Sequence, residues 1–256
     1  RVFKKDNLMR LLLVFALTLP IFAGAAEPTP MELKIQAAID HDRRTDADRE
    51  RDRNRRPKEV LTFVGLQNDM HVLELLPGSG WYTKILGPVL EENGKLYLSI
   101  GTNSVSAMIA DKPGFSTTEI IPFDGIAQST TEEHRATVPE FSFGVRKLDL
   151  VLTFRNLHNF DAAGRANLNA AAFEVLNKGG RYAVVDHTRR HMQPDSYEVW
   201  RRIDPVQVIK EVQAAGFKLV DYSELHYKPD DELRHEVGRK SVTGNTDRFT
   251  LLFEKP

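Results

Sequence analysis

The sequence contains no cysteine among its 256 residues, which excludes a disulfide framework, a thiolate zinc site, an iron–sulfur cluster and a cysteine nucleophile. It also lacks an excess of charge of either sign, because 35 basic residues stand against 36 acidic ones. A chain with that balance has no electrostatic footprint for nucleic acid. The remaining composition, 41% hydrophobic and 9% aromatic, is that of a globular protein long enough for one large domain.

The apolar run from Leu11 to Ala23 is shorter than the roughly 20 residues that a membrane-spanning helix needs. It follows the basic residue Arg10 and ends in small residues before Glu27, which is typical of a secretory signal peptide. We therefore predict a signal peptide over residues 1–26 and a periplasmic or secreted protein. We expect the mature chain to have no stable membrane insertion.

Residues 41–59 interleave both signs of charge and contain few apolar side chains. This pattern favours a solvated helix with i,i+4 ion pairs. The alternative is a helix packed over the mouth of a ligand site. Together with the residues before it, the stretch predicts an N-terminal helical segment, residues 27–60, in front of a single domain over residues 61–256.

Apolar strand-like runs then alternate with helical stretches. The predicted strands cover residues 71–76, 96–100, 118–122, 148–154, 181–186, 217–225 and 249–253. The predicted helices cover residues 81–92, 104–110 and 162–176, and a fourth begins at Asp204–Pro205 and ends at Gly216. This alternation predicts an α/β fold, with a parallel sheet that helices cover on both faces.

The stretch from Val72 to Thr83, VLELLPGSGWYT, is a buried strand followed by a glycine-containing turn and a helix. Such a turn cradles nucleotide-like ligands at the carboxyl end of a first strand. Gly78 and Gly80 lack a Cβ, so the backbone can turn tightly and approach a ligand. Glu74 is placed to accept hydrogen bonds from a cationic amino group. Taken alone, the glycines are also consistent with a simple turn.

Four motifs in order resemble those of the class I S-adenosylmethionine-dependent methyltransferases. The first is VLELLPGSG, and the others are LDLVLTFRNLHNF (148–160), LNKGGRYAVVDH (176–187) and AAGFKLV (214–220). The resemblance implies a Rossmann-like, doubly wound, seven-stranded and mostly parallel sheet of order 3-2-1-4-5-7-6, with an antiparallel last strand over residues 249–253.

A closer resemblance is to a group of exported bacterial methyltransferases. It is carried by PGSGWYT (77–83), TFRNLHNF (153–160) and NTDRFTLLFEKP (245–256), and it covers residues 40–256. It implies an enzyme that binds S-adenosylmethionine and transfers its methyl group to a small molecule.

The resemblance also implies cofactor-binding residues. Glu74, Gly78 and Gly80 match the family's first motif, whereas Leu76 replaces its first glycine. The second strand ends without the family's acidic residue, so Thr102 would contact the ribose as a neutral partner. Asp124 would take the adenine-contacting place, with an ordinary Asp-Gly turn as the alternative.

The loop after the predicted strand 148–154 carries the candidate catalytic residues. Open α/β sheets present reactive groups at the carboxyl ends of their strands. His158 has a suitable ordinary pKa, near ~6.5, for a general base. Arg155 and Asn156 would position the methyl acceptor. His158 as a satisfied loop histidine is the alternative.

Two further clusters remain open. Asp186, His187 and His191 are possible metal ligands without a spacing that guarantees convergence, so we predict no metal site. Arg189 and Arg190 beside them are candidates for holding an anionic substrate.

The long segment 227–245 is a candidate lid or surface excursion. Its basic residues, Arg234, Arg239 and Lys240, would face a substrate carboxylate or phosphate.

The first functional hypothesis is thus a methyltransferase. The second is a non-catalytic exported ligand-binding protein on a methyltransferase fold, because fold does not fix function. Metal-assisted hydrolysis is a third.

Overall fold

A computed structural model describes residues 27–110 and 112–256. The predicted signal peptide, residues 1–26, lies outside these ranges. In the part of the chain that is described, no helix has both the length and the apolar character needed to cross a membrane.

The N-terminal segment is a series of helices: α1 Pro30–Asp40, α2 Asp46–Arg49, α3 Asp52–Arg55 and α4 Pro57–Phe63. The continuous helix favoured for residues 41–59 is therefore wrong. Thr45 caps a new helix at α2, and Arg56 is left-handed, with φ 43°, between α3 and α4. Pro57 disfavours the right-handed helical conformation for the residue before it, which explains the second break.

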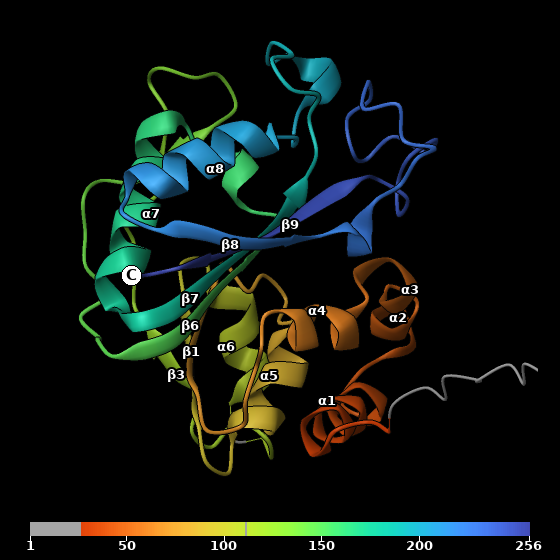
Figure 1. Cartoon of the computed structure of the whole chain (residues 1–256), viewed down its shortest axis with the longest axis vertical. Coiled ribbons are helices and arrows are strands. Elements are labelled where there is room, and N and C mark those ends of the chain that lie inside the picture. The colour runs from red at the N-terminus through yellow and green to blue at the C-terminus, as the bar shows by residue number, and fades with distance from the viewer. Residues whose placement is uncertain (1–26, 111) are drawn as a thin grey trace, which may run out of the picture.

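A seven-stranded sheet forms the centre of the molecule, in the order β3-β2-β1-β6-β7-β9-β8 (Figure 1). Its strands are β1 His71–Leu75, β2 Lys95–Ser99, β3 Glu119–Ile121, β6 Leu148–Phe154, β7 Leu176–His187, β8 Lys218–Ser223 and β9 Arg248–Glu254. The first five in the order are parallel, and β9 runs antiparallel to both of its neighbours. The predicted fold class is confirmed. A short hairpin, β4 Ala127–Gln128 with β5 Ala136–Thr137, was not predicted.

Helices cover both faces of the sheet, as predicted: α5 Thr83–Leu90, α6 Asn103–Ile109, α7 Ala162–Val175 and α8 Pro205–Ala214. Alternate residues of β6 face opposite ways, because side chains along a strand alternate between its two faces. Val151 packs in the cluster that includes α7 and α8, whereas Leu150 and Leu152 pack in the cluster that includes α1, α4, α5 and α6. Figure 1 shows these two helical layers on either side of the sheet.

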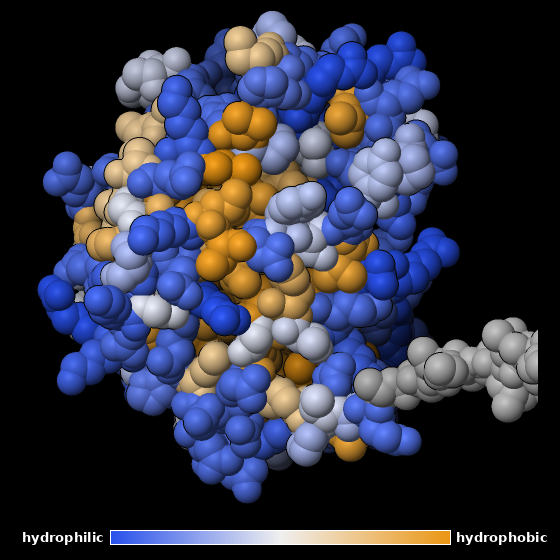
Figure 2. Space-filling model, in the orientation of Figure 1, coloured by the Kyte–Doolittle hydropathy of each residue, from blue (hydrophilic) through white to orange (hydrophobic). Residues whose placement is uncertain are grey.

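The last two strands differ in their cover. β9 is buried along nearly its whole length because it lies between β7 and β8. β8 is an edge strand, and its side chains Val220 and Tyr222 are exposed. An apolar strip therefore runs from α8 across β8 on the face shown in Figure 2.

Three neighbouring parallel strands each end in a left-handed residue that is not glycine. Leu76 follows β1 with φ 50°, Ile100 follows β2 with φ 65°, and Arg155 follows β6 with φ 65°. This conformation costs roughly 1–2 kcal/mol for a residue with a Cβ, and such strain gathers at functional sites. Leu76 therefore adopts, at this cost in free energy, a conformation that glycine would adopt without strain.

The turn after β1 uses its two glycines differently. The N–H of Gly80 donates to the carbonyl of Pro77 at 2.9 Å, and both Gly78 and Gly80 have positive φ. A Cβ on Gly80 would lie 2.5 Å from Met108 and 2.8 Å from Val105, whereas a Cβ on Gly78 would meet nothing within 4 Å. Gly80 thus lets α6 pack against the turn, and Gly78 faces open space.

Comparing Gly80→Ala with Gly78→Ala tests this difference. Both substitutions carry the strain of a positive φ, but only the one at Gly80 also forces the side chains of α6 to move. We expect Gly80→Ala to lower the free energy of unfolding by about 1–3 kcal/mol more than Gly78→Ala does, as measured by urea denaturation. Equal losses would contradict the packing role of Gly80.

Candidate active site

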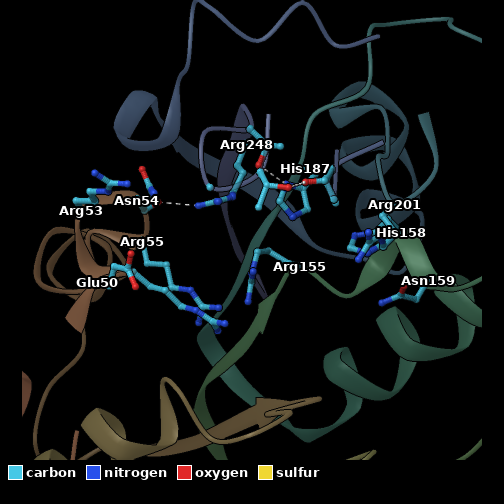
Figure 3. Close-up of a pocket in the computed structure, with 16 residues that line it drawn as sticks. Glu50, Arg53, Asn54, Arg55, Arg155, His158, Asn159, His187, Arg201 and Arg248 are labelled. Carbon is cyan, nitrogen blue, oxygen red and sulfur yellow. Dashed lines mark hydrogen bonds between the residues drawn. The ribbon is translucent and has the colours of Figure 1, made fainter. Parts of the chain in front are cut away.

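A cavity of about 720 Å³ opens at the carboxyl edge of the sheet (Figure 3). Its walls come from the segment around α2 and α3, from the ends of β6 and β7, and from the loop that precedes β9 together with the first residue of that strand. Because β9 is antiparallel, its first residue, Arg248, pairs with His187 at the end of β7 and so reaches the same edge. The volume is in the range of small-molecule sites.

The lining is strongly basic. Among the sixteen residues that line the cavity, six are arginines: Arg51, Arg53, Arg55, Arg155, Arg201 and Arg248. Within the described chain, Glu50 is the only acidic residue in the lining. The cavity therefore favours an anionic ligand.

His158, in the short helical turn Leu157–Asn159 after β6, forms a buried pair with Asp186 near the end of β7. The Nδ1–H of His158 donates to Oδ1 of Asp186 at 2.5 Å, and the backbone N–H of His158 donates to Oδ2 at 3.1 Å. Asp186 also accepts the backbone N–H of His187 at 2.7 Å. A carboxylate on Nδ1 fixes the tautomer that leaves Nε2 as a proton acceptor, and His158 lines the cavity. The pair has the geometry of an oriented general base.

The three residues considered as possible metal ligands do not converge. Asp186 is engaged by His158, Nδ1 of His187 lies 2.9 Å from Oγ1 of Thr246, and His191 pairs with Asp204 at 2.8 Å. Over residues 27–110 and 112–256, no group of three His, Asp or Glu side chains is arranged to hold a metal ion. Burial holds the pKa of His187 well below its usual range, and the charge of Arg248 lowers it further.

Arg55 lies over the aromatic residues that follow the glycine turn. Its guanidinium sits 4.3 Å from the centre of the Trp81 ring, a cation–π contact. Trp81 donates its indole N–H to the carbonyl of Asp48 at 3.0 Å. The neighbouring Tyr82 stacks on Phe154, with ring centres 3.7 Å apart. The N-terminal segment is thereby fixed against the turn, and its charged residues form one wall of the cavity.

Glu74 is buried at the end of β1. Its Oε2 accepts the hydroxyl of Thr83 at 2.6 Å. Burial raises the pKa of Glu74 to about 7, although the Thr83 hydrogen bond and the charge of Arg55 act to lower it. A buried carboxyl that is only partly ionised near neutral pH would gain from a cationic partner.

The remaining sequence-predicted cofactor residues lie along the same edge. Gly78 and Gly80 form the turn after β1, Thr102 precedes α6 without capping it, and Asp124 is exposed after β3. None of these four is among the residues described as lining the cavity.

The candidate catalytic residues Arg155 and Asn156 have different surroundings. Arg155 lines the cavity, and its backbone N–H donates to the carbonyl of Val185 at 2.6 Å. The amide nitrogen of Asn156 donates to the carbonyls of Leu75 and Leu76, at 3.2 and 3.4 Å. Asn156 therefore ties the β6 loop to the end of β1, and its amide hydrogens are directed at the main chain.

Sequence reasoning missed five of the six lining arginines and one pairing. Arg51, Arg53 and Arg55 belong to a charged stretch interpreted mainly as solvated, Arg201 was not singled out, and Arg248 was placed in a motif without a role. Asp186 was considered only as a metal ligand. The parallel register of β6 and β7 would have placed Asp186 near the loop that carries His158, because Phe154, the last residue of β6, pairs with Val185. The basic residues predicted in the segment 227–245 are not in the lining, where Val237, Gly238, Thr243 and Gly244 represent that segment.

No protein-family model matches the sequence, and no curated protein matches it significantly. Solved structures do match the fold. A SAM-dependent methyltransferase from Aquifex aeolicus superposes with a TM-score of 0.54 at 17% identity, over 88% of this chain and 98% of its own. The [4+2]-cyclase SpnF has a TM-score of 0.53 at 15% identity, over 88% and 93% of the two chains.

The glycopeptide N-methyltransferase MtfA, complexed with sinefungin, has a TM-score of 0.50 at 16% identity, over 78% of this chain and 93% of its own. At these identities the likeness shows the fold alone. The chain has the Rossmann-like fold of the SAM-dependent methyltransferases, a fold that is also found in a cyclase.

The raised pKa of Glu74 predicts how stability depends on pH. The folded state holds the carboxyl proton of Glu74 more tightly than the unfolded state does. The contribution of this proton to the free energy of unfolding is therefore largest below pH 4.5 and is lost as pH rises to about 7. The loss is on the order of 3 kcal/mol. Glu74→Gln should remove this decline in urea-denaturation profiles between pH 4.5 and about 7.5. The control Glu133→Gln removes a carboxyl whose side chain is 88% exposed, so it should keep the wild-type profile. A Glu74→Gln profile identical to wild type would contradict the assignment.

The His158–Asp186 pair predicts a proton NMR signal. A buried proton on Nδ1, with that nitrogen 2.5 Å from a carboxylate oxygen, should be strongly deshielded and protected from exchange. We expect the resonance to vanish in His158→Gln and to move upfield in Asp186→Asn. It should remain in His187→Gln, because His187 bonds to a hydroxyl. A signal that survives His158→Gln would show that another proton produces it.

Proposed function

We propose that the protein is an S-adenosylmethionine-dependent methyltransferase that acts on a small molecule. The observation that carries the proposal is the bend after β1, where the bare α-carbon of Gly78 faces open space four residues after the buried Glu74. Both lie at the carboxyl edge of the sheet, where open α/β sheets bind their ligands. The fold found in the structural neighbours supports the same conclusion.

The residues at this edge fit the cofactor. A Cβ on Gly78 or on Gly101 would meet nothing within 4 Å, so the main chain after β1 and after β2 is open to an adenosyl group. Glu74 offers a carboxyl to the cofactor's ammonium group. Thr102 and Asp124 would contact its ribose and adenine. Leu76 reaches the left-handed conformation that the motif's first glycine would supply, so its substitution leaves the bend intact.

When bound, S-adenosylmethionine supplies an electrophilic methyl group. The chain's own contribution is to remove a proton and to position the acceptor. Nε2 of His158 would take the proton of the acceptor's hydroxyl or amino group, and Asp186 would stabilise the imidazolium that results. Arg155, which lies on the same loop after β6, would orient the acceptor. Asn156 would hold the β6 loop, and with it His158, in position, because it links this loop to the end of β1.

The N-terminal segment would exclude water from this reaction. It supplies Glu50, Arg51, Arg53, Asn54 and Arg55 to the cavity wall. The alternative of a non-catalytic binding protein finds no support in the described residues, since the oriented His158–Asp186 pair has no evident use without chemistry.

We further propose that residues 1–26 direct export to the periplasm or the medium. The proposal rests on the apolar run Leu11–Ala23 between Arg10 and a stretch of small residues.

Calorimetric titration with S-adenosylmethionine and S-adenosylhomocysteine tests the proposed function. Both should bind the wild-type chain, and Gly78→Leu should abolish binding because its side chain would fill the space over the bend. Gly144→Leu is the matched control, since Gly144 also has a positive φ and open space around its α-carbon. It should carry a similar strain and retain binding. Absence of binding to wild type at millimolar ligand, or full binding by Gly78→Leu, would contradict the proposal.

A further inference from the structure

Three arginines at the cavity differ from the other inward-facing arginines of the protein. Four buried arginines form ion pairs: Arg44 with Asp52, Arg135 with Asp195, Arg165 with Glu211, and Arg202 with Asp231. Arg55 and Arg248 are 6% and 7% exposed, and Arg155 lies beside them. Among the described residues, none of these three has a carboxylate partner within ion-pair distance, although buried charges in proteins are normally paired.

None of the direct contacts of the three arginines within the described chain is with a carboxylate. Arg55 packs on the Trp81 ring, and Arg248 donates one hydrogen bond to the carbonyl of Asn54 at 2.7 Å. Nε of Arg248 is buried and has no hydrogen-bond partner in the described chain. Arg155 is held by its backbone, which is left-handed directly after β6. All three residues line one cavity, and Figure 3 shows Arg155 between Arg55 and Arg248 among the side chains that line it.

The arginines also repel one another. Burial lowers the pKa of Arg55 to about 9, and the charge of Arg155 lowers it further. Burial likewise lowers the pKa of Arg248 to about 10, again with a contribution from Arg155. A cluster of like charges in a buried site destabilises the ligand-free protein, and a bound anion would remove that penalty.

We propose that Arg55, Arg155 and Arg248 bind an oxyanion, a carboxylate or phosphate, of the small molecule that is methylated. Guanidinium groups match both anions through paired N–H donors. The assignment to the methyl acceptor rests on the proposed function. The anion site itself rests only on the cavity.

The position of the arginines favours the acceptor over the cofactor's own carboxylate. His158 lines the same cavity, whereas Gly78, Gly80 and Thr102 are not in its lining as described. An anion held by the three arginines would therefore bring the rest of its molecule to Nε2 of His158. The predicted basic residues of the segment 227–245 are not needed for this contact.

Arg155→Met in the full chain tests the site, with inorganic phosphate as the probe. Wild type should bind phosphate and unfold at a higher temperature in its presence. Arg155→Met should weaken phosphate binding about tenfold or more, the effect of losing a hydrogen bond to a charged group. It should also raise the melting temperature in phosphate-free buffer, because a repulsive charge has been removed.

Arg201→Met is the matched control. Arg201 lines the same cavity, but its charge is already balanced by Glu236. This variant should keep most of the phosphate affinity of wild type. No phosphate binding by wild type, equal losses in both variants, or a lower melting temperature of Arg155→Met in phosphate-free buffer would each overturn the proposal.

Titration with S-adenosylhomocysteine separates the two possible sources of the anion. If the site takes the acceptor, Arg155→Met should bind S-adenosylhomocysteine as wild type does, and wild type should bind it together with phosphate. An equal loss of both affinities in Arg155→Met, or competition between the two ligands, would assign the site to the cofactor and overturn the proposal. If S-adenosylhomocysteine fails to bind wild type while the phosphate results hold, the methyltransferase proposal fails and the anion site remains.

Discussion

Positive charge buried at the carboxyl edge of the sheet is the constraint around which the site is organised. Arg55, Arg155 and Arg248 come from a short N-terminal helix, the end of β6 and the start of β9. They meet because β9 runs antiparallel beside β7 and because α3 packs over the turn after β1. Elsewhere the fold pairs its buried arginines with carboxylates. The absence of carboxylate partners at these three arginines is what distinguishes a binding site from a set of structural ion pairs.

The same edge concentrates backbone strain and the oriented histidine. Leu76, Ile100 and Arg155 are left-handed at the ends of three adjacent strands, where an unstrained chain would use glycine. Asp186 accepts three hydrogen bonds from the β6 loop and its own strand, and it thereby fixes His158 toward the cavity. Strain and a fixed tautomer both reduce the reorganisation that a reaction requires. The polar residues that follow β2 are neutral, so they give the part of the sheet edge beside β2 no fixed charge.

Much of the fold follows from local sequence. The buried strands β1, β6 and β9 are predominantly apolar runs, and Asp204–Pro205 begins α8 as its capping residues predict. The broken helices of residues 41–59 could not be read from charge periodicity, because the break depends on Arg56 before Pro57 and on Trp81 beneath Arg55. The two glycines of the turn look alike in the sequence, and only the packing of α6 distinguishes them. His158 was identified from its place after a strand, whereas its partner Asp186 required the register of two strands.

The most direct measurement is anomalous diffraction from crystals of the protein grown with S-adenosylhomocysteine and tungstate, an oxyanion that scatters strongly. The account predicts one strong tungsten peak, placed so that the oxygens of the tungstate lie within hydrogen-bond distance of Arg155 and Arg248, on the His158 side of the bound nucleoside. A cavity without a peak, or a peak found only at surface residues outside it, would contradict the claim that these arginines are left unpaired for an anionic ligand.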